Sequence, residues 1–217
     1  MAAEPPRPSA LVLFGGTFDP VHQGHLQVVA ELRRETGQPV AVLPSGVPGH
    51  RPVPAAPAQD RAEMVSLALR HLGDPGASLS LLEVESPGPS YTVETVGKLR
   101  RRQPGQEVVL ALGADAAAAL PTWRRPEELL PQVRLLVFDR RGVRSPAAEV
   151  LARLQRLGLP LTGARAVSLD IPDVDATEVR RRLAQGDPCS GLVLPEVLGY
   201  IRDRGLYGFP RDSPVTS

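Results

Sequence analysis

The sequence predicts an α/β fold, a doubly wound and mostly parallel sheet in a single domain that spans residues 10–208. Short apolar runs bounded by Gly or Pro are typical of strands buried on both faces. Amphipathic segments at helical spacing alternate with these runs along the chain, as in parallel sheets covered by helices. The predicted strands are residues 10–15, 40–44, 78–83, 107–112, 134–138 and 166–169, and the predicted helices are residues 24–35, 59–71, 92–102, 127–130, 146–157, 178–185 and 195–204.

The composition is ordinary for a globular protein and points away from two classes of partner. Of 217 residues, 42% are hydrophobic and 23% are charged, which suffices for one domain with a full core. A net charge of +1 gives no basic field for nucleic acid, and no stretch is long and apolar enough to span a membrane. We therefore expect neither a nucleic-acid nor a membrane partner, and we expect disordered tails at residues 1–9 and 209–217.

The single cysteine and the composition of residues 1–9 favour a cytoplasmic location. Cys189 is the only cysteine, which rules out an internal disulfide and fits a reducing compartment. It has no Cys or His neighbour at zinc spacing, so no metal-ligating residues are predicted. Residues 1–9 contain three prolines and lack the apolar segment of a signal peptide.

The first predicted strand runs directly into the segment GGTFDPVHQGH, residues 15–25. Gly15 and Gly16 have no Cβ, so the backbone can turn tightly and approach a ligand. His22 and His25 fall at or just before the first turn of the next helix and face the same way. Free N–H groups and the positive end of the helix dipole point to the same place, which predicts an anion site suited to an ATP phosphate chain. The alternative is a pair of solvated loop histidines.

This segment resembles the N-terminal signature of the nucleotidylyltransferases that carry an HxGH motif. Several branches share the signature, so it indicates the superfamily and not the substrate. The resemblance implies a Rossmann-like sheet and catalytic roles for His22 and His25. It also implies that ATP is bound by a group of residues from the same segment, namely Gly15, Gly16, Thr17, Phe18 and Gly24.

A second segment, PSGVPGHR at residues 44–51, follows the second predicted strand. His50 and Arg51 at a strand end can reach a phosphate, although a solvated loop is the alternative. The segment resembles the Pro-Ser and Pro-Pro-His-Lys pattern of the family, with Gly49 in place of the second proline and Arg51 in place of the lysine. The resemblance implies that His50 and Arg51 bind the mononucleotide substrate.

Hydroxyl groups mark the start of the helix predicted at 92–102. The segment SYTVET, residues 90–95, can cap this helix or hold a ligand carboxylate. It resembles the Ser-Tyr-Thr-x-x-Thr motif of nicotinate-nucleotide adenylyltransferases, which implies that Thr92 contacts the carboxylate of the nicotinate ring. Upstream, the segment DRAEM at 60–64 resembles the family's Arg-x-x-Met helix, and we interpret Asp60 as an N-cap or first-turn acid.

The fourth predicted strand ends in Gly113-Ala114-Asp115, with Trp123 eight residues later. The Asp115 carboxylate at this strand end can bind a ribose hydroxyl. A lone tryptophan is usually part of the core. Trp123, however, lies in a polar loop between prolines and can stack on an aromatic ring. The pattern resembles the family's Gly-Ala-Asp-x(7)-Trp, which implies that Gly113 and Asp115 bind the nucleotide and Trp123 the pyridine ring.

A late helix carries an arginine close to its start. Thr177 resembles an N-cap, and Arg180 lies in the first turn, where it opposes the helix dipole and so indicates an anionic partner. The segment VDATEVR resembles the family's Ile-Ser-Ser-Thr-x-Ile-Arg, which implies that Thr177 and Arg180 hold ATP phosphates and that Arg180 is catalytic. Asp175 replaces a serine; its carboxylate either repels phosphate or faces away. We interpret the C-terminal segments around Tyr200 and Tyr207 as packing.

Because these resemblances run in order from residue 10 to about residue 207, the chain is identified as a member of the bacterial nicotinate-nucleotide adenylyltransferases. The family transfers the adenylyl group of ATP to nicotinate mononucleotide, and Mg²⁺ accompanies the ATP. Adenylylation of nicotinamide mononucleotide or phosphopantetheine, cytidylyl transfer, and a nucleotide-binding regulator without turnover remain alternatives. The oligomeric state and closure of the 46–57 loop on substrate stay open.

Overall fold

The computed structural model describes residues 10–48, 53–140 and 146–211. Its main sheet has six parallel strands in the order β4-β2-β1-β6-β7-β8. The strands are β1 (Ala10–Gly16), β2 (Val40–Pro44), β4 (Ala77–Leu79), β6 (Glu107–Gly113), β7 (Arg134–Arg140) and β8 (Arg165–Leu169). The doubly wound parallel sheet is confirmed. The order reverses beside β1, so the switch point of the sheet lies between the carboxyl ends of β1 and β6.

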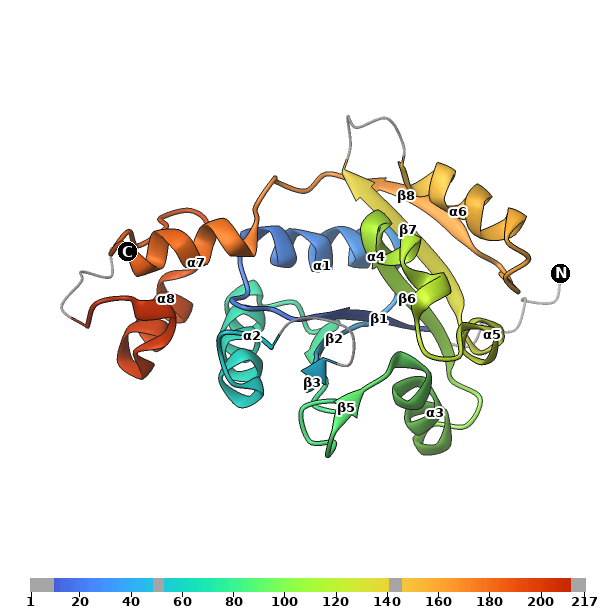
Figure 1. Ribbon diagram of the computed structural model, residues 1–217, viewed down its shortest axis with the longest axis horizontal. Helices are drawn as coiled ribbons and strands as arrows, with labels where there is room; N and C mark the ends of the chain where they lie inside the picture. Colours follow the sequence, from blue (N-terminus) through green and yellow to red (C-terminus); the bar gives the residue numbers. More distant parts are fainter. Residues whose placement is uncertain (1–9, 49–52, 141–145, 212–217) are drawn as a thin grey trace, which may run out of the picture.

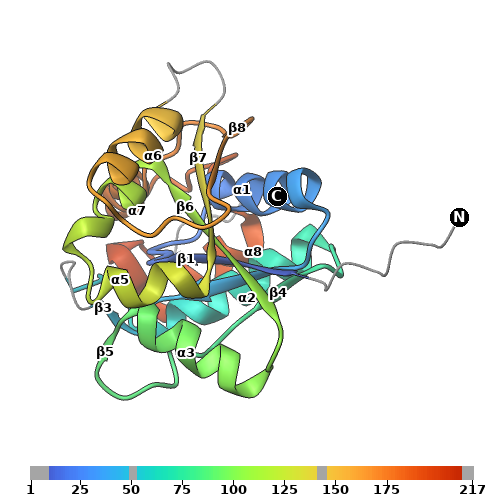
Figure 2. The same ribbon diagram turned by 90° about the vertical axis from the view of Figure 1, so that its right-hand side faces the viewer.

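Helices cover both faces of this sheet (Figures 1 and 2). They are α1 (Gln23–Thr36), α2 (Ala58–Leu72), α3 (Thr92–Arg102), α4 (Ala114–Ala118), α5 (Pro126–Leu129), α6 (Pro146–Arg156), α7 (Ala176–Ala184) and α8 (Pro195–Arg204). Short 3-10 turns follow at η1 (Leu120–Thr122), η2 (Leu130–Gln132) and η3 (Leu206–Gly208). Figure 1 shows α7 and α8 together at one end of the molecule.

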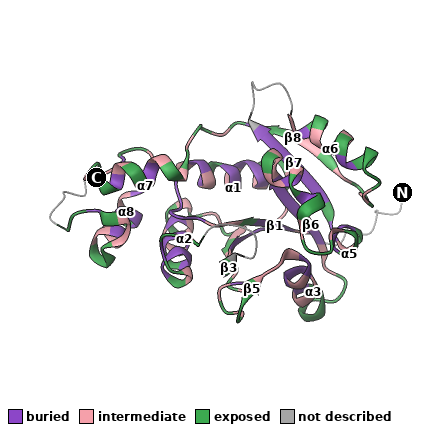
Figure 3. Cartoon of the chain, in the orientation of Figure 1, coloured by how far each residue is buried: buried purple, intermediate pink, exposed green. Residues whose placement is uncertain are grey.

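Alternation along the strands divides the core into two parts, one on each face. Val12 and Phe14 of β1 pack with α1, α2, α7 and α8, whereas Leu13 packs with α3, α4, α5 and α6. Buried residues follow the central strands and the inner sides of the helices (Figure 3). Two faces that both bury apolar side chains explain why the strands read as continuous apolar runs.

The predicted elements agree with the structure except at a few points. The third strand ends at Leu79 and not at residue 83, because the chain turns back on itself there, with Glu85 N–H donating to Leu81 O. Neither α4 nor the two-stranded parallel sheet formed by β3 (Val47–Pro48) and β5 (Pro89–Ser90) was predicted from the sequence. The predicted start of the disordered C-terminal tail at residue 209 is wrong, because Phe209 is only 2% exposed and belongs to the core.

Two polar residues have partners that the sequence did not indicate. Asp60 is an acid of the first turn of α2 but not its N-cap, which is Pro57. Its Oδ1 accepts hydrogen bonds from the Tyr200 hydroxyl at 2.7 Å and from Arg204 Nε at 3.0 Å. Tyr200 therefore ties α8 to α2 and does not merely pack. Within the described residues, no helix is long and apolar enough to cross a membrane.

Candidate active site

A cavity of about 160 Å³ opens at the carboxyl ends of β1, β2 and β6, beside the switch point of the sheet. The end of β1, the start of α3 and the loop after η1 all contribute to its lining; Gly15 and Gly16 are the last two residues of β1 and not a turn after the strand. Among the predicted site residues, the lining includes Gly15, Gly16, Thr17, Thr92 and Trp123. The sequence motifs therefore converge on one place, although the first and the last of them are more than 100 positions apart in the chain.

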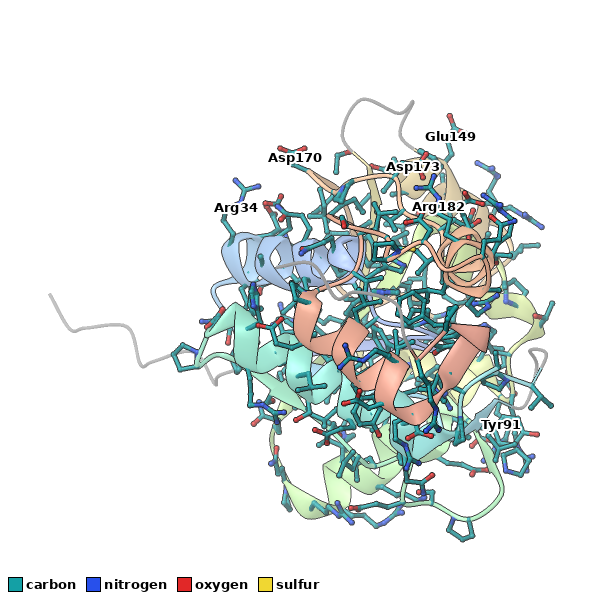
Figure 4. The ribbon with its side chains drawn as sticks, turned by 90° about the vertical axis from the view of Figure 1, so that its left-hand side faces the viewer. Arg34, Tyr91, Glu149, Asp170, Asp173 and Arg182 are labelled. Atoms are coloured by element: carbon teal, nitrogen blue, oxygen red, sulfur yellow. The ribbon has the colours of Figure 1, made fainter. Side chains whose placement is uncertain are left out.

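The predicted phosphate-binding residues lie on the other side of the Gly15–Thr17 segment. The cavity is lined by Leu13 and Leu112, which belong to the core on the α3 side. The ring of His25 instead packs on Phe18, at a centroid distance of 4.8 Å, in the core on the α1 side. Figure 4 shows Tyr91 of the cavity at the lower right of the view and Arg34 of α1 at the upper left. The Gly15–Thr17 segment at the end of β1 thus lies between two half-sites.

His22 and His25 stack on each other at the start of α1. Their ring centroids are 3.7 Å apart, and His22 is the N-cap residue, as expected from the sequence. The His22 backbone N–H donates to Nδ1 of His25 at 3.3 Å, which leaves the proton of the neutral His25 ring on Nε2. A Cβ on Gly24 would lie 3.1 Å from the His22 ring, so a glycine at this position leaves room for the ring. Both imidazoles are set at a helix N-terminus, where anions bind.

Both histidines are held in the neutral form in the free protein. Burial lowers the pKa of His22 to about 4, although the Asp175 carboxylate acts in the opposite direction. Burial, with a smaller contribution from His22, lowers the pKa of His25 well below its ordinary value. Nδ1 of His22 is buried without a hydrogen-bond partner. A bound phosphate would favour the charged imidazolium and so reverse these shifts.

The Phe18 ring packs against the ring of His25 and so supports the histidine pair. Phe18 is 1% exposed and adopts a positive φ of 52°. A Cβ on Gly16 would come within 2.9 Å of the same ring, which explains the glycine there. Because the Phe18 side chain is buried, only its backbone is left for the ATP contact that the sequence predicted.

The start of α7 brings Thr177 and Arg180 together, but the N-cap differs from the expectation. Asp175 is the N-cap residue, and its Oδ1 accepts from the Thr177 N–H at 2.7 Å. Asp is a stronger N-cap than Thr, so it takes that position. The Asp175 carboxylate thus caps its own helix and also acts on the pKa of His22, so its effect on a bound phosphate stays open. Arg180 Nη2 donates to Thr177 Oγ1 at 3.3 Å.

The start of α3 carries no side-chain cap, so capping does not explain its hydroxyl residues. Thr92 is the first residue of α3 and lines the cavity, where the free N–H groups and the positive dipole end of a helix favour a carboxylate. Trp123 is half-buried, packs partly on the core and also lines the cavity. Arg124 lies over the Tyr91 ring, 4.5 Å from its centroid, at the same wall.

The remaining predicted residues are placed less fully. Gly113 ends β6 and caps α4, and Asp115 is an exposed residue in the first turn of α4, at the carboxyl edge of the sheet. Neither lines the cavity. His50 and Arg51 lie outside the described residues, so their predicted contacts with a mononucleotide stay predictions.

Arg61 was not recognised from the sequence as part of the site architecture. It is 1% exposed, and its guanidinium donates to Thr17 O at 2.6 Å, Ser45 O at 2.7 Å and Gly46 O at 2.9 Å. A fourth bond joins Nε to Ala56 O at 3.1 Å. Arg61 therefore fixes the loops after β1 and β2 to each other. The signal in the sequence was weak, because one arginine in an amphipathic helix normally faces solvent.

Glu83 is a second residue that sequence reasoning missed. Its carboxyl is 8% exposed, lines the cavity and accepts a hydrogen bond from Thr95 Oγ1 at 2.9 Å. Burial raises the pKa of Glu83, while Thr95, Ser90 and Lys98 act in the opposite direction. The sequence offered no signal, because the residue falls in a segment that was predicted to be a strand.

Fold and site together define a nucleotidyltransferase-like enzyme of the doubly wound α/β class, with a stacked histidine pair at the start of its first helix. The model of the cytidylyltransferase-like family matches residues 13–182. A relative from Gloeobacter violaceus, named "Probable nicotinate-nucleotide adenylyltransferase", is 38% identical over 207 residues, which cover 92% of this chain and 97% of the relative. A relative of the same name from Rubrobacter xylanophilus is 38% identical over 201 residues, 90% of each chain.

A solved structure supports the fold. The Plasmodium falciparum nicotinic acid mononucleotide adenylyltransferase complexed with NaAD superposes with a TM-score of 0.75 at 15% identity, covering 94% of this chain and 100% of that one. The chain belongs to the cytidylyltransferase-like family and, within it, to the nicotinate-nucleotide adenylyltransferases.

Proposed function

We propose that this protein transfers the adenylyl group of ATP to nicotinate mononucleotide, giving deamido-NAD and pyrophosphate. One observation carries the proposal: a stacked histidine pair at a helix N-terminus adjoins a cavity whose wall holds a second helix N-terminus and a tryptophan. The histidine pair at the start of α1 suits a triphosphate, and the cavity suits an aromatic ring that bears a carboxylate.

The reaction needs no nucleophile from the protein. The 5′-phosphate of the mononucleotide attacks the α-phosphorus of ATP, a new P–O bond forms, and the bond to the bridging oxygen breaks as pyrophosphate leaves. His22 and His25 bind the phosphates and stabilise the charge that develops on them. Arg180 and Thr177 hold the β- and γ-phosphates. Gly15, Gly16, Thr17, Phe18 and Gly24 offer backbone to the nucleotide, with Gly113 and Asp115 at the ribose.

The mononucleotide occupies the cavity. Thr92 and the first turn of α3 receive the nicotinate carboxylate, and Trp123 stacks on the pyridine ring. These groups favour the acid over the amide, because a helix N-terminus attracts negative charge. His50 and Arg51 bind the phosphate of the mononucleotide.

Mg²⁺ enters as part of the ATP substrate. Within the described ranges, no three His, Cys, Asp or Glu side chains are gathered to hold a metal ion. Mg²⁺ commonly binds through phosphates and water with few protein ligands, so a triphosphate suffices to carry it. A cytoplasmic location, and the absence of membrane and nucleic-acid partners, stay predictions from the sequence.

The decisive experiment is pyrophosphate release from Mg-ATP, with nicotinate and nicotinamide mononucleotides run side by side. A strong preference for the acid supports the proposal and the roles of Thr92 and Trp123. Equal rates would replace it with dual specificity. No release with either substrate would reject turnover and favour a nucleotide-binding regulator.

A further inference from the structure

Asp19 gathers three other segments of the chain, at residues 55–56, 180 and 207, around one buried carboxylate. Its side chain is 7% exposed. Oδ2 accepts from the Ala55 N–H at 2.7 Å, and Oδ1 accepts from the Ala56 N–H at 3.1 Å and from the Tyr207 hydroxyl at 2.7 Å. A buried charge is costly unless it is paired and hydrogen-bonded, and each of these donors offsets that cost.

Arg180 reaches the same residue from α7. Its Nη1 donates to the backbone O of Asp19 at 2.6 Å and lies 4.0 Å from Oδ2 of the carboxylate. Nη2 donates to Thr177 Oγ1. The Arg180 side chain is nevertheless 31% exposed, so part of its guanidinium stays open to a ligand at the start of α7.

This arrangement has a physical purpose. Because α7 begins at Ala176, Arg180 is its fifth residue and lies beyond the first turn in which the sequence placed it. A long arginine side chain loses rotamer freedom when it binds a ligand. The backbone O of Asp19 holds one nitrogen of the fork before the ligand arrives, and the Asp19 carboxylate places a negative charge 4.0 Å from that nitrogen. The cost of ordering Arg180 then falls on folding and not on binding.

We propose that Asp19 is a positioning residue for ATP, acting by holding the Arg180 guanidinium toward the site at the start of α7. This inference rests on the proposed function only in placing the triphosphate at Arg180. It does not depend on which mononucleotide is used or on turnover.

The test is a double-mutant cycle on ATP affinity, measured by isothermal titration calorimetry with Mg-ATP and no mononucleotide. Asp19→Asn keeps the size of the side chain but removes its charge and one acceptor; we expect about tenfold weaker ATP binding. Arg180→Ala weakens binding as well. Adding Asp19→Asn to Arg180→Ala causes no further loss, because the effect of Asp19 passes through Arg180.

Glu178→Gln is the matched control. It changes a carboxylate to an amide beside Arg181 and Arg182 on the same helix, without a contact to Arg180 or Asp19. We expect its ATP affinity to stay within about twofold of the wild type. A loss as large as that of Asp19→Asn would mean that any lost charge near α7 has this effect, and would overturn the proposal.

Tyr207→Phe keeps the proposal falsifiable should Asp19→Asn not fold. It removes one donor to Asp19 and leaves the carboxylate in place; we expect a loss of about two- to threefold that vanishes in the Arg180→Ala background. Equal losses in both backgrounds, or no loss from Arg180→Ala, overturn the positioning role. If the double-mutant cycle gives the expected ATP affinities but the protein releases no pyrophosphate, the proposed function is rejected and the positioning role of Asp19 is not.

Discussion

The imidazoles of His22 and His25 lie face to face, with their centroids 3.7 Å apart and their planes inclined by 27°. Two cations cannot share such a position without strong repulsion, so the pair is stable in the free protein because burial keeps both rings neutral. An anion placed at the start of α1 removes that restriction. The pair is thereby suited to respond to phosphate charge.

Replacing His25 by alanine should slow catalysis more than it weakens ATP binding. We expect kcat to fall about 100- to 1000-fold with little change in KM for ATP, because the stabilisation is greatest as charge develops in the transition state. Steady-state kinetics with Mg-ATP and nicotinate mononucleotide measure this. His71→Ala, which removes an exposed histidine elsewhere, is the control. Weaker binding of both substrates with kcat intact would contradict the role.

The free protein should lose stability as the pH falls from about 6.5 to 4. The pKa of His22 is lowered to about 4 in the folded protein, so the unfolded chain binds more protons in this interval. His22 alone accounts for up to about 3 kcal/mol of the free energy of unfolding. Urea unfolding at several pH values measures the slope. His22→Asn should flatten it, and an unchanged slope would show that His22 is not the group responsible.

Trp123→Ala should weaken the mononucleotide and spare ATP. Stacking of an aromatic side chain on a base contributes about 1–3 kcal/mol, so KM for nicotinate mononucleotide should rise roughly tenfold to a hundredfold. Trp123→Phe keeps a stacking surface and should recover most of the loss. Trp123 is also the only tryptophan, so its fluorescence reports binding directly. Fluorescence that does not change at saturating mononucleotide would place the ring elsewhere.

Glu83→Gln should stabilise the protein at high pH. The pKa of Glu83 is raised in the folded state, so the folded protein carries an unfavourable buried charge at pH values above that pKa. The amide keeps an acceptor for Thr95 and removes the charge. We expect a higher Tm than the wild type at pH 8 and a smaller difference toward pH 4. Glu85→Gln, at an exposed position nearby, is the matched control. An equal or lower Tm at pH 8 would contradict a raised pKa.

The sequence was a good guide to the fold because its strands are buried on both faces. The helices at 92–102 and 195–204 begin and end where they were predicted, the second because Pro195 starts it and Gly205 ends it. The β3–β5 pair could not be found, since two residues in each strand leave no periodicity to detect. The Thr177 cap was misassigned because Asp175, two residues earlier, competes for the same position.

The site was predictable where residues cluster in the sequence and not where they meet only in space. The histidine pair and its glycines form one continuous segment. By contrast, Tyr207 is 188 positions from Asp19, and Arg61 contacts loops 15 and 44 positions away. Such roles depend on burial and on partners that no local pattern specifies.

Arg61 has a consequence for inhibitors. Its four bonds to main-chain carbonyls make the wall at Thr17 and Ser45 nearly immovable. Another part of the lining, where Arg124 covers Tyr91, consists of side chains that are partly exposed and are held by side-chain contacts. A tight inhibitor should therefore match the shape of the wall at Thr17 and Ser45 closely. Its substituents should be varied where they face Arg124 and Tyr91, because side chains adjust to a ligand more easily than the main chain does.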